Sequence, residues 1–296
     1  MTMPDTTAAY LTTRELAELL RIKERKVYDL AGNGEVPCVR VVGKLLFPRA
    51  EIEAWMAAAR SGPSAAEAPP QVIVGSHDPL LDWALRESGC GIAAFLDGSL
   101  DGLDRFARRE AVACALHIHE PDGWNTATLA SRLPGAPVVL VEFARRARGL
   151  IVAPGDPFGI AGIADLAGRS FARRQAGAAS QRLFEALAQA AGLDAAALPG
   201  PTSVARTEAD VALRVLEGKA DAAFGLACVA RQFGLGFVPL IEERFDLAVW
   251  RRGWFEPPFQ RLIGFLGTEG FRARVAEFGG YDTTGLGRVH YNAAVG

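Results

Sequence analysis

Three side chains that hydrolytic enzymes use stand side by side at Ser76, His77 and Asp78, directly after a glycine that ends an apolar run. A serine nucleophile needs a histidine within reach of its hydroxyl and a third group that orients this histidine. Neighbouring side chains at a helix start point in different directions, and the chain has no G-x-S-x-G elbow. We therefore expect no catalytic centre here, and we expect Asp78 to cap the following helix.

A metal site is the second chemistry to weigh. His117 and His119 alternate in an expected strand, so their side chains would share one face. With Glu120 or Asp122 they could bind a metal ion, but no third ligand follows at a typical spacing. We expect no metal. The two histidines are interpreted as a structural pair or as part of a cleft wall, with His119, at the strand end, closer to a ligand.

Small and hydroxyl residues mark four expected strand-to-helix junctions: Gly75-Ser76, Gly98-Ser99, residues 177–180 and Arg206-Thr207. Each would place a free backbone N–H group at the positive end of a helix. One such junction is an ordinary helix cap, but several that meet at one cleft would form an oxyanion site without lysine or metal.

The elements around these junctions fall into two parts. Residues 1–60 show helical periodicity at 12–20, with Thr12 and Glu15 as a capping box, and again at 23–31. Two short strands that turn at Gly43-Lys44 and a third helix complete the order of a winged helix-turn-helix. Residues 61–71 are rich in Ala, Pro, Ser and Gly and are predicted to be a linker.

A local basic excess favours DNA binding by this first part, with Lys44 at the hairpin tip reaching a phosphate. Between residues 21 and 49 there are seven basic residues and three acidic ones. The candidate DNA contacts are Lys23, Arg25, Lys26, Tyr28, Arg40 and Lys44. The alternative is a protein-interaction module with a solvated basic face.

The first part resembles the excisionase/MerR-like DNA-binding family over "YLTTRELAELLRIKERKVYDLAGNGEVPCVRVVGKLLFPRAEIEAWM". The remainder alternates apolar strands with helices, which predicts an α/β fold. It resembles periplasmic-binding-protein-like domains related to molybdate-binding proteins, through segments such as "GSHDPLLDWAL", "GSLDGL" and "GGYDTTGLG". That resemblance implies a two-lobed type II domain over 72–296, with lobe one at about 72–149 and 241–296 and lobe two at about 150–240.

The resemblance also assigns ligand contacts. Ser76 and Ser99 match hydroxyl donors at the first two helix starts. A family loop of the form RQxGSGTR stands here as residues 174–181, RQAGAASQ, with two alanines in place of a serine and a glycine. These alanines put molybdate itself in question more than a ligand cleft. The candidate ligand contacts are Ser76, His77, Ser99, His119, Gly177, Ala178, Ala179, Ser180, Thr207, Phe224 and Tyr281.

The length, composition and net charge of the chain agree with this interpretation. The chain has 296 residues, half of them hydrophobic, and a net charge of -2, so any attraction to DNA must be local. Four scattered cysteines argue against a zinc site and a disulfide framework. We expect a cytoplasmic protein without a secretory signal or membrane span.

These observations predict a transcriptional regulator, expected to be a homodimer or a higher homo-oligomer, that binds double-stranded DNA and senses a small oxyanion such as molybdate or tungstate. No cofactor is expected besides this effector. The alternatives are a sensor of a small organic ligand, a DNA-binding assembly protein that no longer senses, and an enzyme tethered by its first domain.

Overall fold

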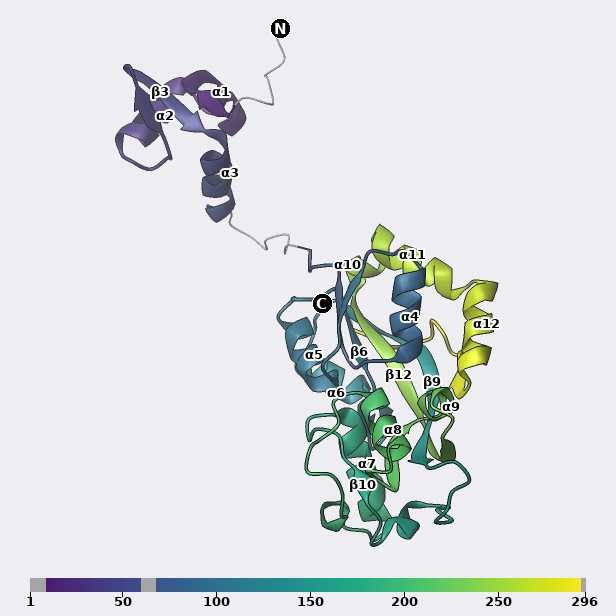
Figure 1. Cartoon of the computed structure of the whole chain (residues 1–296). Helices are drawn as coiled ribbons and strands as arrows, with labels where there is room; N and C mark the ends of the chain where they lie inside the picture. Colours follow the sequence, from purple (N-terminus) through teal and green to yellow (C-terminus); the bar gives the residue numbers. More distant parts are fainter. Residues whose placement is uncertain (1–8, 60–67, 294–296) are drawn as a thin grey trace. The chain divides into compact units, whose positions relative to one another are not determined.

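The computed structural model describes residues 9–59 and 68–293. Contacts divide the chain into two compact units, Met1–Glu67 and Ala68–Gly296, and each unit is described by itself. Figure 1 labels the elements of both. None of the helices in the described ranges has the length and apolar character that crossing a membrane requires.

The first unit is a winged helix-turn-helix with a small antiparallel sheet. Its elements are β1 (Tyr10–Thr12), α1 (Thr13–Leu20), α2 (Glu24–Gly32), β2 (Val39–Val41), β3 (Lys44–Pro48) and α3 (Arg49–Ala58). The predicted capping box is confirmed, because Thr12 Oγ accepts from the Glu15 N–H group at 3.3 Å and Glu15 Oε2 accepts from the Thr12 N–H group at 2.7 Å. Leu16, Val27 and Phe47 are fully buried at its centre.

In this unit one strand was not predicted and one prediction, the position of the hairpin turn, was wrong. The sequence did not indicate β1, which pairs with β3 and is too short to show an alternating pattern. The hairpin turns at Val42 and Gly43, since Val41 pairs directly with Lys44. Both turn residues have positive φ, 46° and 78°, as a two-residue hairpin loop requires. Val42, which is 98% exposed, therefore occupies the tip, and Lys44 begins β3.

The second unit alternates strands and helices. Its first elements are β4 (Val72–Gly75), α4 (Pro79–Glu87), β5 (Ala93–Phe95), α5 (Ser99–Ala107), β6 (Ala113–Leu116), β7 (His119–Glu120), β8 (Gly123–Trp124), α6 (Thr126–Arg132) and β9 (Val138–Val152). Next come β10 (Phe171–Ala172), α7 (Ala179–Ala190), α8 (Glu208–Leu216), β11 (Ala222–Leu226), α9 (Ala227–Gln232) and β12 (Gly236–Trp250). The chain ends with α10 (Arg251–Trp254), α11 (Pro257–Leu266), α12 (Glu269–Phe278), β13 (Tyr281–Asp282) and β14 (Val289–Asn292).

Two long antiparallel strands, β9 and β12, run through the whole unit. The strand order is β10-β11-β9-β12-β6-β4-β5, so β9 and β12 pair with each other at the centre. The end of β9 pairs with β11 on one side, and the end of β12 pairs with β6 on the other. We call the part around β4, β5, β6 and helices α4 and α5 lobe one, and the part around β10, β11 and helices α7 and α8 lobe two.

Each lobe has its own apolar core on both faces of the sheet. In lobe one, Ile73, Leu81 and Phe259 lie in one cluster and Leu103 and Phe106 in another. In lobe two, the corresponding clusters contain Val211 and Val229, and Leu183 and Phe184. Helices α4, α11 and α12 pack together over lobe one (Figure 1).

Glycines allow the close backbone packing and the turn that precede helices α4 and α5. A Cβ atom at Gly75 would overlap the Ala115 carbonyl oxygen, and one at Gly102 would overlap the Gly75 backbone. These two glycines therefore let β4, β6 and α5 approach closely. Gly98 has a φ of 136°, which lets the chain turn into α5.

Candidate functional site

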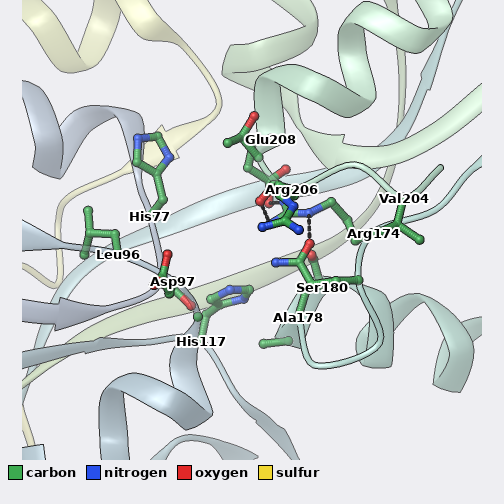
Figure 2. Close-up of a pocket in the computed structure, with 15 residues that line it drawn as sticks. His77, Leu96, Asp97, His117, Arg174, Ala178, Ser180, Val204, Arg206 and Glu208 are labelled. Carbon is green, nitrogen blue, oxygen red and sulfur yellow. Dashed lines mark hydrogen bonds and ion pairs between the residues drawn. The ribbon is translucent and has the colours of Figure 1, made fainter. Parts of the chain in front are cut away.

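A cavity of about 460 Å³ lies between the starts of the lobe-one and lobe-two helices. It is lined by Ser76, His77, Leu96, Asp97, Gly98, His117, Arg174, Gln175, Ala178, Ala179, Ser180, Val204, Arg206, Thr207 and Glu208. In Figure 2, His77, Asp97 and His117 lie on one side, and Arg174, Arg206 and Ser180 on the other. Both lobes thus contribute to one cavity.

The four helices that begin near this cavity differ in how their first turns are satisfied. Asp78 Oδ1 accepts from the Leu81 N–H group at 2.7 Å and caps α4, as predicted. Thr207 and Asp210 form a capping box on α8. By contrast, α5 begins after Gly98 and α7 after Ala178, and neither residue gives a side-chain cap. First-turn N–H groups have no acceptor within their own helix. No N-cap side chain satisfies those of α5 and α7, and both helix starts border the cavity through Gly98, Ala179 and Ser180.

Positive charge comes from lobe two. Arg174 Nη1 lies 3.2 Å from Glu208 Oε1, and Arg174 Nη2 donates to the Arg206 carbonyl oxygen at 2.9 Å. Arg206 is exposed, and its guanidinium forms no ion pair with any described residue. Glu208 is buried and is shared with Arg148, whose Nη2 donates to Glu208 Oε1 at 3.0 Å. Arg206 is thus the cation of this wall that is open to an anion.

Lobe one contributes hydroxyl groups and two acceptors. Ser76 Oγ and Ser99 Oγ are 2.6 Å apart, and Ser99 Oγ accepts from the His117 N–H group at 3.4 Å. Asp97 is exposed and lines the cavity with its carboxylate. His117 is only 5% exposed but also lines the cavity, and its Nδ1 lies 3.1 Å from Glu243 Oε2.

Behind the cavity, a buried ionic network joins the two long strands. Arg146 of β9 donates to Asp78 Oδ2 at 2.9 Å and also to Glu243 of β12. Arg148 Nε lies 2.9 Å from Glu243 Oε1. Burial alone would disfavour the Glu243 charge, but Arg146 and Arg148 outweigh it and hold the pKa of Glu243 well below its usual range. Through Asp78 and Glu208 this network reaches a helix start in each lobe.

Two family models match the chain. A PBP superfamily domain model covers residues 82–267, and a helix-turn-helix domain model covers residues 10–60. The chain belongs to the PBP superfamily domain family. Its PBP domain follows a helix-turn-helix domain, and this pairing fits a ligand-responsive DNA-binding regulator. Neither matched family is an enzyme family.

Three known proteins are similar to this PBP-domain chain over most of its length. The uncharacterized protein YvgK of Bacillus subtilis (strain 168) is 26% identical over 96% of this chain and 98% of its own. An H2O2-bound cysteine-to-serine mutant of Corynebacterium glutamicum OxyR is 14% identical, covering 90% of this chain and 91% of that chain with a TM-score of 0.52. A phosphate-bound substrate-binding protein from Clostridium perfringens is 12% identical, covering 70% and 96%, with a TM-score of 0.50. At these identities the solved structures indicate the fold.

Six of the predicted ligand residues line the cavity of the PBP domain: Ser76, His77, Ala178, Ala179, Ser180 and Thr207. The Thr207 hydroxyl is already used, because it accepts from the Asp210 N–H group at 3.0 Å. The expected free N–H group at Ser76 is also engaged, since it donates to the Ala115 carbonyl oxygen at 2.9 Å. Because all six line the cavity, they remain candidate ligand contacts.

The other predicted ligand residues lie elsewhere. Ser99 is buried behind Ser76, and Gly177 is not among the lining residues. Phe224 is buried against Phe184, with ring centroids 5.7 Å apart. The Tyr281 hydroxyl donates to Asp78 Oδ2 at 2.8 Å and so belongs to the ionic network. These positions correct the expectation that all of them face the ligand.

We expected His119 to lie closer to the ligand than His117, but His117 lines the cavity and His119 does not. β6 ends at Leu116 and β7 begins at His119, so His117 and His119 do not alternate on one strand. His119 is exposed, packs edge-on against Trp124 and lines a separate cavity of about 190 Å³. Among the described residues, no group of three or more His, Cys, Asp or Glu side chains could hold a metal ion.

Four residues that line the cavity were not among the predicted ligand contacts: Asp97, Arg174, Arg206 and Glu208. Arg206 belongs to a predicted junction, Asp97 and Glu208 are next to one, and Arg174 opens the loop that leads to another, so the residues in and beside those junctions carried the missing signal. In the helix-turn-helix domain, the candidate DNA contacts are all exposed, and none forms an ion pair within the described part of the chain: Lys23, Arg25, Lys26, Tyr28, Arg40 and Lys44.

Proposed function

We propose that this protein is a transcriptional regulator whose PBP domain senses a small anion in the cavity between α5 and α7. The observation that carries the proposal is the meeting of two uncapped helix starts with the unpaired guanidinium of Arg206 in one cavity of the described chain. Helix N-termini and guanidinium groups both favour oxyanions. Molybdate and tungstate are the effectors that the family resemblance suggests, and phosphate is bound by a structural neighbour.

DNA binding is proposed for the exposed basic residues of α2 and the β2–β3 hairpin. In helix-turn-helix domains the second helix enters the major groove, and basic side chains fix its position on the phosphates. Lys23, Arg25 and Lys26 lie at the start of α2, where they would face the groove. Arg40 and Lys44 lie on the paired hairpin strands.

Closure of the two lobes over the anion is proposed to change the spacing of two DNA-binding domains in a homodimer. A ligand shifts such an equilibrium only by its differential affinity for the open and closed states. An anion that bridges α5 of lobe one and α7 of lobe two would favour the closed state. Such a regulator would act in the cytoplasm, together with its operator.

A small organic anion is the second candidate effector. Leu96, Val204 and Ala178 add apolar surface to the cavity, and Asp97 adds a carboxylate that would repel a simple dianion. A volume of about 460 Å³ falls within the range of roughly 300–1,000 Å³ that pockets for organic ligands occupy. This candidate keeps the same site and the same regulatory role.

Two variants test the proposal. Ser76→Ala, at a serine that lines the cavity, should weaken thermal stabilisation by an anion from a panel of molybdate, tungstate, sulfate and phosphate, and should leave binding to a random-sequence DNA duplex unchanged. Lys23→Ala with Lys26→Ala should weaken DNA binding and leave thermal stabilisation by the anion unchanged. It should also lower the slope of log K against log salt by about 1.8, because each phosphate contact contributes roughly 0.9.

The matched control for DNA binding is Arg252→Ala, an exposed arginine of the PBP domain that should leave the salt slope unchanged. Circular dichroism would verify that each variant is folded. If the serine variant altered DNA affinity without any anion present, the assignment of the two roles would be wrong. If no small anion stabilised the wild type while a neutral compound did, the anion sensor would be excluded.

A further inference from the structure

Only one ring nitrogen of His117 is engaged within the described part of the chain. The residue is buried at the end of β6, and its Nδ1 is engaged by Glu243 Oε2 at 3.1 Å. Because His117 also lines the cavity, Nε2 is the ring nitrogen that remains for a ligand. Whether Nε2 donates or accepts a hydrogen bond depends on where the proton of the ring lies.

The surroundings of Glu243 determine the position of that proton. Arg146 and Arg148 both contact the Glu243 carboxylate, which is completely buried. Their two positive charges keep the carboxylate ionised, and an ionised carboxylate can only accept hydrogen bonds. Nδ1 of His117 must therefore carry the proton and donate it to Glu243.

The same surroundings keep the ring neutral. Burial lowers the pKa of His117, and Arg146 and Arg148 on β9 act in the same direction, against the pull of Glu243 on β12. In a neutral ring with its proton on Nδ1, Nε2 is a bare acceptor. Asp97, in the loop before α5, faces the same cavity as a second acceptor (Figure 2).

We propose that the cleft selects an anion that also carries a hydrogen-bond donor, an O–H or N–H group, which it places against His117 Nε2 and Asp97. The inference rests on the proposed function and narrows its effector to hydroxylated or aminated anions, with hydrogen phosphate as the simplest example. A fully deprotonated tetrahedral anion such as sulfate, molybdate or tungstate would set oxygen lone pairs against both acceptors. A buried acceptor without its donor is costly, so the site discriminates against such anions.

Calorimetry on the full chain near neutral pH tests this selection with two matched pairs: phosphate against sulfate, and lactate against acetate. In each pair only the first anion carries a donor. We expect at least one donor-bearing anion to bind roughly tenfold or more tightly than its partner. Molybdate or tungstate binding as tightly as phosphate, or sulfate and acetate matching their partners, would overturn the inference.

Asp97→Asn provides a variant that cannot disturb the core, because Asp97 is exposed. Its amide adds a donor, so the preference for phosphate over sulfate should fall several-fold. His117→Gln should have the same effect by placing an amide at the position of the ring. An unchanged preference in both variants would contradict the inference.

Nitrogen-15 NMR of the histidine rings in the unliganded protein provides a test that needs no ligand. The His117 signals, identified by their loss in His117→Gln, should show a proton on Nδ1 and a bare Nε2. A proton on Nε2, or a doubly protonated ring near neutral pH, would refute the inference even if anions bind. If the NMR result is as expected but no anion binds, the anion-sensing proposal fails instead.

Discussion

The two walls of the cavity share one backbone design and carry opposite side chains. Each lobe contributes one helix that is capped by its own side chains, α4 or α8, and one that is uncapped, α5 or α7. Lobe two adds the guanidinium groups of Arg174 and Arg206, whereas lobe one adds the acceptors Asp97 and His117. In the proposed function, the backbone would therefore contact the anion from both sides, and the side chains define a charged end and an accepting end.

If the cavity binds an anion as proposed, this difference would make it specific without a lysine among the lining residues. The uncapped helix starts attract negative charge in general. The choice between anions then depends on the side chains that flank them, which pair attractive contacts on one wall with repulsive ones on the other. Both walls are connected to the central strands through Glu243, which contacts both Arg146 and Arg148. Arg146 pairs with Asp78 of lobe one, and Arg148 pairs with Glu208 of lobe two.

The largest effect is expected from breaking the buried ionic network that joins the two walls to β9 and β12. Glu243→Ala would leave Arg146 and Arg148 with an uncompensated positive charge in the interior. Removing one partner of a buried pair costs about 3–5 kcal/mol, so urea unfolding should show a loss of this size. Glu242→Ala is the matched control, since Glu242 is exposed and pairs with Arg145 at the surface. It should change stability by no more than about 0.5 kcal/mol. Equal effects would show that the network does not support the walls.

Arg206→Ala should weaken the charged end of the cavity. A hydrogen bond to a charged group contributes about 1.5–3 kcal/mol, so affinity for the anion should fall roughly 10- to 100-fold by calorimetry. Thermal stability without ligand should not change, because Arg206 has no ion pair in the described part of the chain. Arg214→Ala, which removes an arginine bonded to Ser203 in the same lobe, should leave affinity unchanged. Equal losses from both variants would point to a general charge effect.

A smaller effect is expected at the accepting end, from the pH dependence of stability. Burial lowers the pKa of His117 in the folded protein, so the unfolded chain takes up the proton more readily as pH falls through about 6.5. Stability should therefore fall on acidification across that window, by at most about 1.4 kcal/mol per pH unit from this residue. His117→Gln should flatten the curve relative to wild type. An identical slope in the two proteins would mean that His117 is not held neutral by folding.

The sequence predicted those features that local patterns determine. The Thr12 capping box, the Asp78 cap and the order of the winged helix-turn-helix all depend on residues a few positions apart. The four junctions were located because small and hydroxyl residues follow apolar runs. The resemblance to the excisionase/MerR-like family placed the first part and the resemblance to PBP-like domains placed the second, and the two family models confirm both.

The ionic network was missed because it depends on distant pairing. Arg146 meets Glu243 across 97 residues, and His117 meets Glu243 across 126. The first contact follows from the antiparallel register of β9 and β12, and the second from the pairing of β6 with β12, neither of which a local pattern specifies. Arginine is also common throughout this chain, so a single arginine, such as Arg206, carried little signal in the sequence.

Backbone amide NMR during a titration of the full chain with phosphate tests most directly whether an anion sits between the uncapped helix starts. We expect the largest shifts at the first turns of α5 and α7, including Leu100, Ala179 and Ser180. The first turn of α4 should change little, because Asp78 already satisfies it. Shifts of equal size at α4 and α8, or none at α5 and α7 despite binding, would contradict the assignment of the cavity as the anion site.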